Sequence, residues 1–441
     1  MNTPPFPDDQ INPHDVASQE SFAGFVRRAS ARGELVLQPR MGFADPTQMR
    51  RGLVATRQAQ ATTVGTITLD SYTRVSDYAA VDRALAEGIA LNGYPIVNYG
   101  PAVTQRMLDG VHDASFPVQV RHGSPDPEWI FRTLMAAGLD ATEGGPVSYC
   151  LPYSRLPLHT SVDNWARCCD LLARLRDTGI EPHLESFGGC MLGQLCPPSL
   201  LVAISVLEGL FFHQHGLCSV SLSYAQQTDN SQDTEAISAL QQLAAEFLPD
   251  SDWHVVLYAY MGVYPRTREG ALRLLSEAAE LAVRTGAARL IVKTPAEAHR
   301  IPTIADNVDA LETAAGVAAA VSVESCKTLP DSGILTEARA LIEAALELHP
   351  SVGTALVRAF ARGYLDVPYC LHADNRGRSR SYVDARGKLA WSSVGSMPIR
   401  SMSEACETRQ VTASGLLSSL SYIERKFDGP VISSSPTESL L

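Results

Sequence analysis

The chain has 441 residues, of which 45% are hydrophobic and 19% charged, and a formal net charge of −12 at pH 7. This composition excludes a disordered chain, and the acidic balance argues against a nucleic-acid-binding protein, which needs a basic face to neutralise phosphates. The length is sufficient for one large barrel and an accessory segment. We therefore expect a soluble globular protein in which any anionic ligand is bound by local cations.

Residues 1–23 are polar, acidic and rich in proline, which predicts a flexible tail and not a secretion signal. The longest apolar run, residues 200–212, is interrupted and too short for a bilayer, so we expect no membrane segment. The nine cysteines contain no C-x-x-C pair. Free thiols in a reducing cytoplasm are therefore expected in preference to disulfides or a zinc site.

Short apolar runs alternate with helical patterns between residues 24 and 325, and glycine follows several of the helical patterns, as is usual at a helix end. About eight strand and helix units in succession predict an α/β fold with a parallel sheet closed into a (β/α)8 TIM barrel. A doubly wound sheet is the alternative, but no G-x-G-x-x-G or G-x-x-x-x-G-K-[ST] motif follows a strand. The predicted strands are residues 34–39, 64–69, 94–99, 116–120, 146–150, 181–186, 219–223, 254–260 and 288–293.

From about residue 304 the pattern becomes helical, and an irregular stretch rich in arginine follows at residues 371–391. We expect residues 326–441 to form a C-terminal extension of helical and irregular structure that packs on the barrel. Within the extension, a mobile polar loop is predicted near Asn375 to Ser381, and the last ten or so residues are predicted to be disordered.

Arginine lies at or soon after the end of three predicted strands, at Arg40, Arg74 and Arg121. Because the active site of a (β/α)8 barrel is built from the loops that follow the strands, the three side chains would meet at the barrel mouth. Any one of them alone is better explained as a rim residue paired with a helix carboxylate. Three together repel one another unless an anion compensates, and a guanidinium matches a carboxylate with two parallel hydrogen bonds. The pattern therefore predicts a small substrate with two carboxylates.

The segment TEGGPVSYCLPY adds Glu143, Tyr149 and Tyr153 to the same region. A carboxylate among three arginines can accept a substrate ammonium, and two phenols can donate to substrate oxygens. The alternative is that Glu143 neutralises the arginines and the tyrosines pack in the barrel. Together with the arginines, these residues predict a pocket for an amino dicarboxylic acid.

Six further residues have simpler structural explanations than catalysis. Histidines that end an amphipathic helix commonly cap it, a thiol without a neighbouring base is usually buried and inert, and an aspartate after a strand usually begins a turn. We therefore predict no metal site. The six residues are, in pairs, His213 and His215, Cys150 and Cys196, and Asp70 and Asp126.

Several long motifs in order resemble one known family. They are QPRMG, LDSYTR, LNGYPIVNYG, VQVRHGSPD, EGGPVSYCLPY, LCPPS, YMGVYP and LIVKTPAEAHRIPT. They are similar to the large (epsilon) subunit of glutamate mutase, also called methylaspartate mutase. The resemblance covers residues 35–303 and continues more loosely through VGTALVRAFARGYLDVPY in the extension.

The resemblance implies a (β/α)8 barrel whose mouth faces adenosylcobalamin, much of which is carried by a separate small subunit. Homolysis of the cobalt–carbon bond would give a deoxyadenosyl radical that removes a hydrogen from L-glutamate. The substrate radical would rearrange to the skeleton of L-threo-3-methylaspartate. The cofactor supplies the difficult chemistry in such an enzyme, and the protein supplies positioning and exclusion of water.

The resemblance also implies roles for individual residues. Arg40, Arg74 and Arg121 correspond to an arginine claw for the two substrate carboxylates. His122, Tyr149 and Tyr153 correspond to further substrate contacts, and Glu143 to the group that binds the ammonium and can take its proton. Two residues that the resemblance implies as cobalamin contacts, Lys293 and Glu297, would without it be explained as a salt bridge. The implied cobalamin contacts are Gly42, Asn92, Pro152, Tyr264, Lys293, Glu297 and Ile301.

The chain departs from the family pattern at Tyr258 and Ala259, where that pattern has histidine and glutamine, and in the loop LHADNRGRSR. It also lacks a D-x-H-x-x-G motif, whose histidine coordinates cobalt in cobalamin-binding modules. A small cobalamin-binding subunit is therefore expected as partner, in a heterotetramer that contains two large subunits. The alternatives are a related radical mutase for another amino dicarboxylate and a degenerate subunit without turnover.

Overall fold

The computed structural model describes residues 21–191, 195–322, 332–399 and 411–429. The tail predicted at residues 1–23 lies largely outside the described residues, as does most of the C-terminal segment predicted to be disordered. In the described part of the chain, no helix combines the length and the apolar character that crossing a membrane requires.

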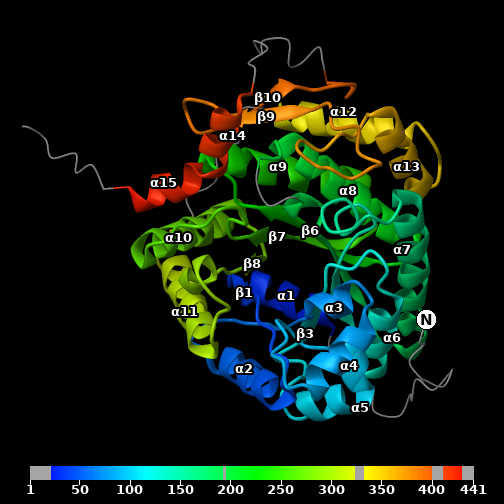
Figure 1. Ribbon diagram of the computed structural model, residues 1–441, viewed down its shortest axis with the longest axis vertical. Helices are drawn as coiled ribbons and strands as arrows, with labels where there is room; N and C mark the ends of the chain where they lie inside the picture. Colours follow the sequence, from blue (N-terminus) through cyan, green and yellow to red (C-terminus); the bar gives the residue numbers. More distant parts are fainter. Residues whose placement is uncertain (1–20, 192–194, 323–331, 400–410, 430–441) are drawn as a thin grey trace, which may run out of the picture.

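Eight parallel strands form the centre of the molecule (Figure 1). Their hydrogen-bonded order is β1-β8-β7-β6-β5-β4-β3-β2. A parallel bridge between Leu37 and Thr63 joins the two ends of this order and closes the sheet, so the predicted (β/α)8 barrel is confirmed. The strands are β1 (Val36–Gln38), β2 (Gly65–Thr68), β3 (Val118–Arg121), β4 (Ala141–Gly144), β5 (His183–Ser186), β6 (Ser219–Ala225), β7 (Asp252–Tyr258) and β8 (Arg289–Ile291).

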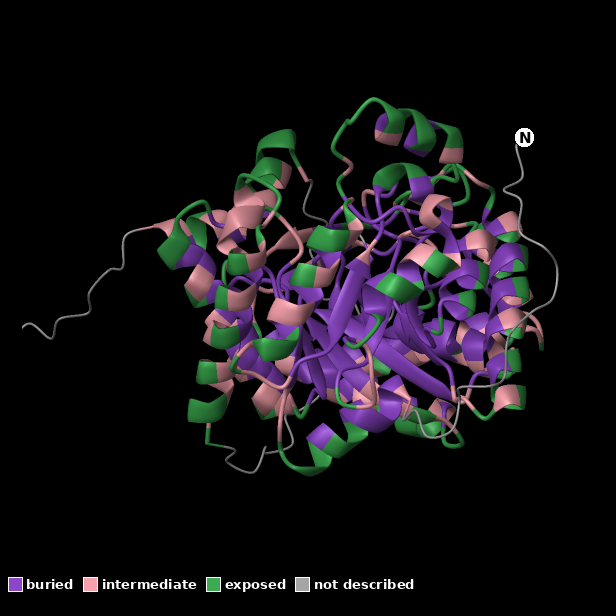
Figure 2. Cartoon of the chain, turned by 90° about the horizontal axis from the view of Figure 1, so that it is seen from below, coloured by how far each residue is buried: buried purple, intermediate pink, exposed green. Residues whose placement is uncertain are grey.

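Helices surround the barrel, with buried residues on their inner faces and exposed residues on their outer faces (Figure 2). Local signals explain their ends: the Thr267 side chain accepts a hydrogen bond from Gly270 N at the start of α10, and Gly286 ends that helix with a φ of 70°. The helices of the barrel are α2 (Pro46–Gln58), α3 (Ser71–Arg74), α4 (Tyr78–Ala86), α5 (Ile96–Leu108), α6 (Glu128–Ala136), α7 (Leu158–Ala173), α8 (Pro198–Gln214), α9 (Asn230–Phe247), α10 (Arg268–Thr285) and α11 (Ile304–Ala320), with short 3-10 turns at η2 (Arg174–Thr178), η3 (Gly188–Cys190) and η4 (Pro295–Ala298).

Two of the nine predicted strands are wrong. In residues 94–99, Tyr94 makes one isolated bridge to Leu69, and helix α5 then begins directly after Pro95. Residues 146–150 form a series of turns, because Tyr149 N bonds to Gly145 O and Cys150 N bonds to Val147 O. The strand of this unit is β4, a few residues earlier in the chain.

The C-terminal segment packs on one side of the barrel. Helix α12 (Ile334–Leu346) lies against α8 and α9, and α13 (Val352–Arg362) lies against α7 and α8. A two-stranded antiparallel sheet of β9 (Arg380–Val383) and β10 (Leu389–Ser393) follows, and it was not predicted. The last described elements are α14 (Ala413–Leu420) and α15 (Tyr422–Asp428), of which α15 contacts α10.

The predicted mobile loop at Asn375 to Ser381 is instead held by buried groups. The Asn375 side chain is buried and exchanges hydrogen bonds with the backbone of Val367 at 2.8 and 2.9 Å. The carboxylate of Asp366 accepts hydrogen bonds of 2.7 Å from the backbone N–H groups of residues 377–379. These partners lie upstream in the chain, which a composition rich in arginine and glycine does not reveal.

Helix α1 (Phe22–Ala31) covers the end of the barrel where the strands begin. Phe22 is fully buried, and its ring stacks on His183 at a centroid distance of 5.2 Å and lies 4.9 Å from the Arg289 guanidinium. The carboxylate of Asp140 accepts a hydrogen bond of 3.4 Å from Phe22 N. The first residues of α1 therefore close this end of the barrel, which in such folds contributes stability.

Asp140 is expected to give the fold a dependence on pH. Burial raises the pKa of its carboxyl to about 6, whereas an aspartate in an unfolded chain titrates near about 4. The native state therefore binds more protons between these values, and the free energy of unfolding falls as the pH rises through this window. As the pH rises from 4 to 7, the free energy of unfolding of Asp140→Asn should increase by up to about 3 kcal/mol relative to that of the unsubstituted chain, which urea unfolding measures.

Asp163→Asn, at an exposed position of α7, serves as the control for this prediction and should show a difference that is independent of pH. If the stability difference for Asp140→Asn is equally independent of pH, the carboxyl is not the source of the effect.

Candidate functional site

The residues predicted to bind substrate lie at the mouth of the barrel, at or after the carboxyl ends of the strands. Arg40 follows β1, Arg74 ends α3 after β2, and Arg121 is the last residue of β3. Glu143 lies in β4, and Tyr149 lies in the turns that follow this strand. The barrel topology thus brings together side chains that are more than a hundred residues apart in the sequence.

The centre of the site is a buried ion pair between Arg121 and Glu143. Arg121 Nε lies 2.7 Å from Glu143 Oε2, and the two side chains are 6% and 2% exposed. The phenol of Tyr149 donates a hydrogen bond to Glu143 Oε1. Although burial alone would raise it, the pKa of Glu143 stays below its usual value because of the Arg121 charge and these hydrogen bonds. Glu143 is therefore a carboxylate at neutral pH.

Arg74 is a second cation beside this pair. Its Nε and Nη2 atoms donate to the carbonyl oxygen of Leu69 at 3.0 and 2.7 Å. Burial and the nearby charge of Arg121 lower its pKa, although Tyr149 and Glu143 act in the opposite direction. Asp70 caps the short helix α3, since its carboxylate accepts from Tyr72 N and Thr73 N at 2.9 and 3.0 Å. Asp70 thus holds the turn that carries Arg74, in the turn role that the sequence predicted.

Arg40 lies on the side of the mouth formed by β1 and β8. Its Nη1 atom is 3.2 Å from Glu297 Oε2, and its Nε atom is buried without a hydrogen-bond partner among the described residues. Tyr153, which follows β4, is 51% exposed at the mouth, within electrostatic range of both Arg40 and Arg74. The three arginines therefore border one region, although each makes different protein contacts.

His122 is fixed beside Arg121. Its Nδ1 atom accepts a hydrogen bond of 3.0 Å from Ser124 N, and its ring stacks on Trp165 at a centroid distance of 5.7 Å. Burial lowers its pKa to about 3, so the ring is neutral and its hydrogen is on Nε2. Nε2 is buried without a partner among the described residues. A donor in this state is suited to a ligand oxygen.

Glu208 on α8 holds the turns that follow β4. Its carboxylate accepts hydrogen bonds from Val147 N at 3.1 Å and from Ser148 N and Ser148 Oγ at 2.9 Å each. A Cβ atom at Gly145 would lie 2.1 Å from this carboxylate, which explains the glycine. The contact fixes the backbone directly before Tyr149, and the sequence analysis did not find it.

The residues expected to contact cobalamin surround the same mouth. Lys293 Nζ lies 4.2 Å from the centroid of the Tyr264 ring, and burial lowers the lysine pKa to about 8. Glu297 pairs with Arg40 and not with Lys293, so the simple salt bridge considered from sequence is wrong. At Gly42 a Cβ atom would lie 2.2 Å from Thr68 O, so only glycine fits there.

Three further residues of the predicted cofactor set lie at the rim of the mouth. Asn92 is exposed, and its Oδ1 atom accepts a hydrogen bond of 2.9 Å from Ser71 N. Pro152 is partly buried after β4, and Ile301 after β8 is 59% exposed. The exposed isoleucine provides an apolar edge at the rim that a large ring system can cover.

The structure adds three buried polar residues below the mouth that the sequence analysis did not assign to the site. The Tyr258 hydroxyl on β7 donates to Glu143 Oε2 at 2.7 Å and also contacts Glu185 Oε1 on β5. Arg289 on β8 pairs with Glu185. The sequence contains a signal for these residues, namely a glutamate and an arginine inside otherwise apolar strand segments. Parallel barrel strands are usually apolar throughout, so such charged residues indicate a buried polar site.

The remaining polar candidates lie in ordinary structural settings. His213 and His215 bond to Ser251 Oγ and Asp170 Oδ1, at 2.9 and 2.8 Å. Burial raises the pKa of the Cys150 thiol to about 12 and that of Cys196 even further, and Asp126 N bonds to Ser124 Oγ in a turn. No group of three or more potential metal ligands is present in the part of the chain that the structure describes.

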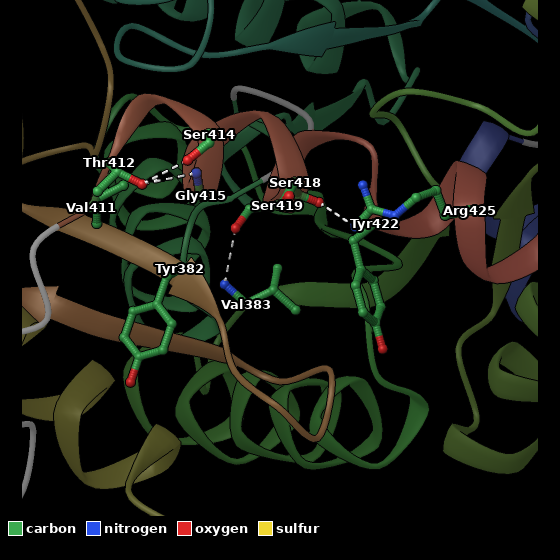
Figure 3. A pocket seen from close by; sticks show the side chains of 10 residues that line it. All are labelled: Tyr382, Val383, Val411, Thr412, Ser414, Gly415, Ser418, Ser419, Tyr422 and Arg425. Atoms are coloured by element: carbon green, nitrogen blue, oxygen red, sulfur yellow. Dashed lines mark hydrogen bonds between the residues drawn. The ribbon is translucent and has the colours of Figure 1, made fainter.

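A separate cavity of about 530 Å³ lies between β9 and the helices α14 and α15 (Figure 3). Its lining includes Tyr382, Tyr422 and Arg425, and Arg425 bonds to the Ser418 carbonyl at 2.8 Å. None of the residues predicted to bind substrate or cofactor lines it. The candidate site is therefore identified by the convergent charged side chains at the barrel mouth.

Comparison with known proteins gives one consistent result. A model of the methylaspartate mutase E chain (MutE) family matches residues 16–418. The glutamate mutase epsilon subunit of Escherichia coli O157:H7 is 30% identical over 401 residues, which cover 87% of this chain and 82% of the relative. That of Desulfitobacterium hafniense (strain Y51) is 31% identical over 404 residues, with the same two shares, and that of Halobacterium salinarum is 32% identical over 374 residues, with shares of 82% and 76%. Because the family model spans most of its length, the chain belongs to the methylaspartate mutase E-chain family.

Proposed function

We propose that this chain is the catalytic large subunit of an adenosylcobalamin-dependent glutamate mutase, an isomerase that converts L-glutamate to L-threo-3-methylaspartate. One observation carries the proposal beyond family membership. In the described residues, Arg40 and Arg121 are each paired with a glutamate, whereas Arg74 makes no ion pair with a carboxylate. Of the three arginines, Arg74 therefore has a positive charge without a paired carboxylate, and glutamate with two carboxylates and one ammonium has one net negative charge.

The protein groups divide the substrate between them. The arginines bind the two carboxylates, since each guanidinium can donate two parallel hydrogen bonds. Glu143 accepts the ammonium and is the group placed to take a proton from it, because it is ionised and already fixed by Arg121. His122 Nε2 and Tyr153 provide neutral donors to the substrate oxygens, and Tyr149, which donates its hydrogen to Glu143 Oε1, holds that carboxylate beside the ammonium. Burial of Arg121, His122, Glu143 and Tyr149 excludes water from them and strengthens their contacts.

Adenosylcobalamin fits the rim of the mouth on chemical grounds. Lys293 and Glu297 offer a donor and an acceptor to the ribose hydroxyls, and Tyr264 supports the lysine. The apolar edge at Ile301 suits a large flat group, and Gly42 belongs to the proposed set as the residue that lets the backbone after β1 lie close to Thr68 O. Asn92 and Pro152 complete the proposed cofactor set. When bound, the cofactor supplies the radical that starts the rearrangement.

Large exposed apolar residues support a partner that covers the mouth. Several of them follow strands β2, β4, β7 and β8. Leu371 lies in a C-terminal loop whose residues Cys370 and His372 bond to carbonyl oxygens in the segment after β4. We propose that a small cobalamin-binding subunit covers them, in a heterotetramer with two large subunits. The compartment we propose is the cytoplasm, because all seven cysteines in the described residues are free thiols. The exposed residues are Tyr72, Val75, Tyr153, Val263, Ile301 and Leu371.

Co-production with a small cobalamin-binding subunit tests the proposed function. With adenosylcobalamin added, we expect uptake of the cofactor in the visible spectrum and formation of 3-methylaspartate from L-glutamate, which NMR detects. Turnover of a different amino dicarboxylate, without methylaspartate, would show a related mutase. Absence of both uptake and product would show a degenerate subunit without catalysis.

A further inference from the structure

A continuous series of buried charged and polar groups extends from the mouth into the barrel. Arg121 pairs with Glu143, the Tyr258 hydroxyl lies between Glu143 and Glu185, and Arg289 pairs with Glu185. All five side chains are buried, and those of Glu185, Tyr258 and Arg289 are fully so. Two arginines neutralise two carboxylates, so the series is balanced in charge.

The hydroxyl of Tyr258 faces more acceptors than it can satisfy. A phenol carries one hydrogen, but carboxylate oxygens of Glu143 and Glu185 both lie within hydrogen-bond distance. Glu143 has other donors in Arg121 and Tyr149. Among the described residues, the hydrogen bond to Glu185 Oε1 comes from Tyr258. When the hydrogen points to Glu185, the phenol oxygen faces Glu143 Oε2 at 2.7 Å and gains a hydrogen bond if Glu143 becomes protonated.

The Tyr258 ring is held in this orientation by two neighbouring side chains. The Arg121 guanidinium lies 5.3 Å from the centroid of the ring, and the Phe187 ring meets it edge-on at 5.5 Å. The hydroxyl therefore cannot turn away from the two carboxylates without disturbing the Arg121–Glu143 pair. A tyrosine used only for packing would not need a hydroxyl between two carboxylates, which is a costly place for a polar group.

We propose that Tyr258 is a positioning residue that lets Glu143 share a proton with Glu185. This inference rests on the function proposed above. As the substrate ammonium is deprotonated, an N–H bond breaks and an O–H bond forms on Glu143. Glu143 then passes this proton to the phenol oxygen while the phenol passes its own to Glu185 Oε1. The net result is one proton moved to Glu185, and the same steps in reverse return it.

Tyr258→Phe tests the inference in the complete enzyme with the small subunit and adenosylcobalamin. We expect kcat to fall by about 10-fold or more while the KM for L-glutamate changes by less than about 3-fold, because the hydroxyl acts on proton transfer and not on binding. Tyr258→His should recover part of the loss, since an imidazole donates from one nitrogen and accepts at the other. Glu185→Gln should lower kcat similarly, and the double variant should be no worse than the worse single one.

Tyr94→Phe is the matched control, because this buried tyrosine has its hydroxyl 3.2 Å from Thr104 Oγ1. It should leave kcat unchanged. Equal losses in both tyrosine variants, or a raised KM with kcat kept, would overturn the inference in favour of simple packing. If Tyr258→Phe fails to fold, Glu185→Gln decides alone. If the unsubstituted enzyme turns over L-glutamate and Tyr258→Phe has the same kcat, the inference is overturned but the proposed function stands. If the unsubstituted enzyme shows no turnover, the proposed function is overturned and the inference with it.

Discussion

Arg121→Lys is expected to lower kcat/KM for L-glutamate by about 100-fold or more, because each charge-assisted hydrogen bond of the guanidinium fork contributes about 1.5–3 kcal/mol. Lysine keeps the positive charge but loses the planar fork that donates to a carboxylate with two parallel hydrogen bonds. It also lacks the Nε atom that lies 2.7 Å from Glu143 Oε2, so Glu143 loses part of its support. Steady-state kinetics with L-glutamate measure the effect.

The exposed pair of Arg132 and Glu128 on α6 provides a matched control. Its Nε to Oε1 distance is 3.0 Å, close to that of the buried pair, but its side chains are 46% and 38% exposed. Arg132→Lys should therefore change kcat/KM by less than about 2-fold, since exposed pairs contribute little. If Arg121→Lys turns over glutamate as well as this control does, the guanidinium does not bind the substrate as proposed.

Glu143→Gln is expected to lower kcat by about 100-fold to 10,000-fold, the range that a positioned general base contributes. The amide is close in size to the carboxylate, but it cannot take a proton from the substrate ammonium. The substrate ammonium also loses its carboxylate partner, so weaker glutamate binding should accompany the loss of kcat. Kinetics and calorimetric binding of L-glutamate separate these two effects.

Glu128→Gln repeats the same chemical change in the exposed α6 pair and should leave both measurements unaltered. A Glu143→Gln variant that binds glutamate weakly but keeps its kcat would show that Glu143 only holds the ammonium. In that case the proton would have to go elsewhere, and the role proposed for Tyr258 would fail as well.

The barrel could be predicted from sequence because its signals are local and repeated. Each unit joins a short apolar run to an amphipathic helix, and glycine often marks the helix end. The two incorrect strands show where local signals fail. Residues 94–99 have the composition of a strand, but Pro95 precedes the first helical turn of α5. Residues 146–150 are held in turns by Glu208, which is distant in the sequence and gives no local sign.

The positions of the three arginines at the mouth could also be predicted, because each follows a strand and parallel strands end on one side. Their individual partners could not. Arg40 pairs with a residue that follows the last strand, and Arg74 bonds to a backbone carbonyl. The series below the mouth was harder still, since Tyr258 and Glu185 come from β7 and β5 and meet only when the barrel closes.

Helix α8 has a consequence for how the chain can be divided. Nearly all of its residues are buried, because strands β5 and β6 cover one side and α12 and α13 cover the other. Apolar residues of the barrel and of the C-terminal segment form one continuous core through this helix, with Phe360 and Trp391 as members from the C-terminal side. A barrel without that segment would expose a large apolar surface to water and would be prone to self-association. The C-terminal part thus covers an apolar face of the barrel, and we expect the barrel to need it to remain monodisperse.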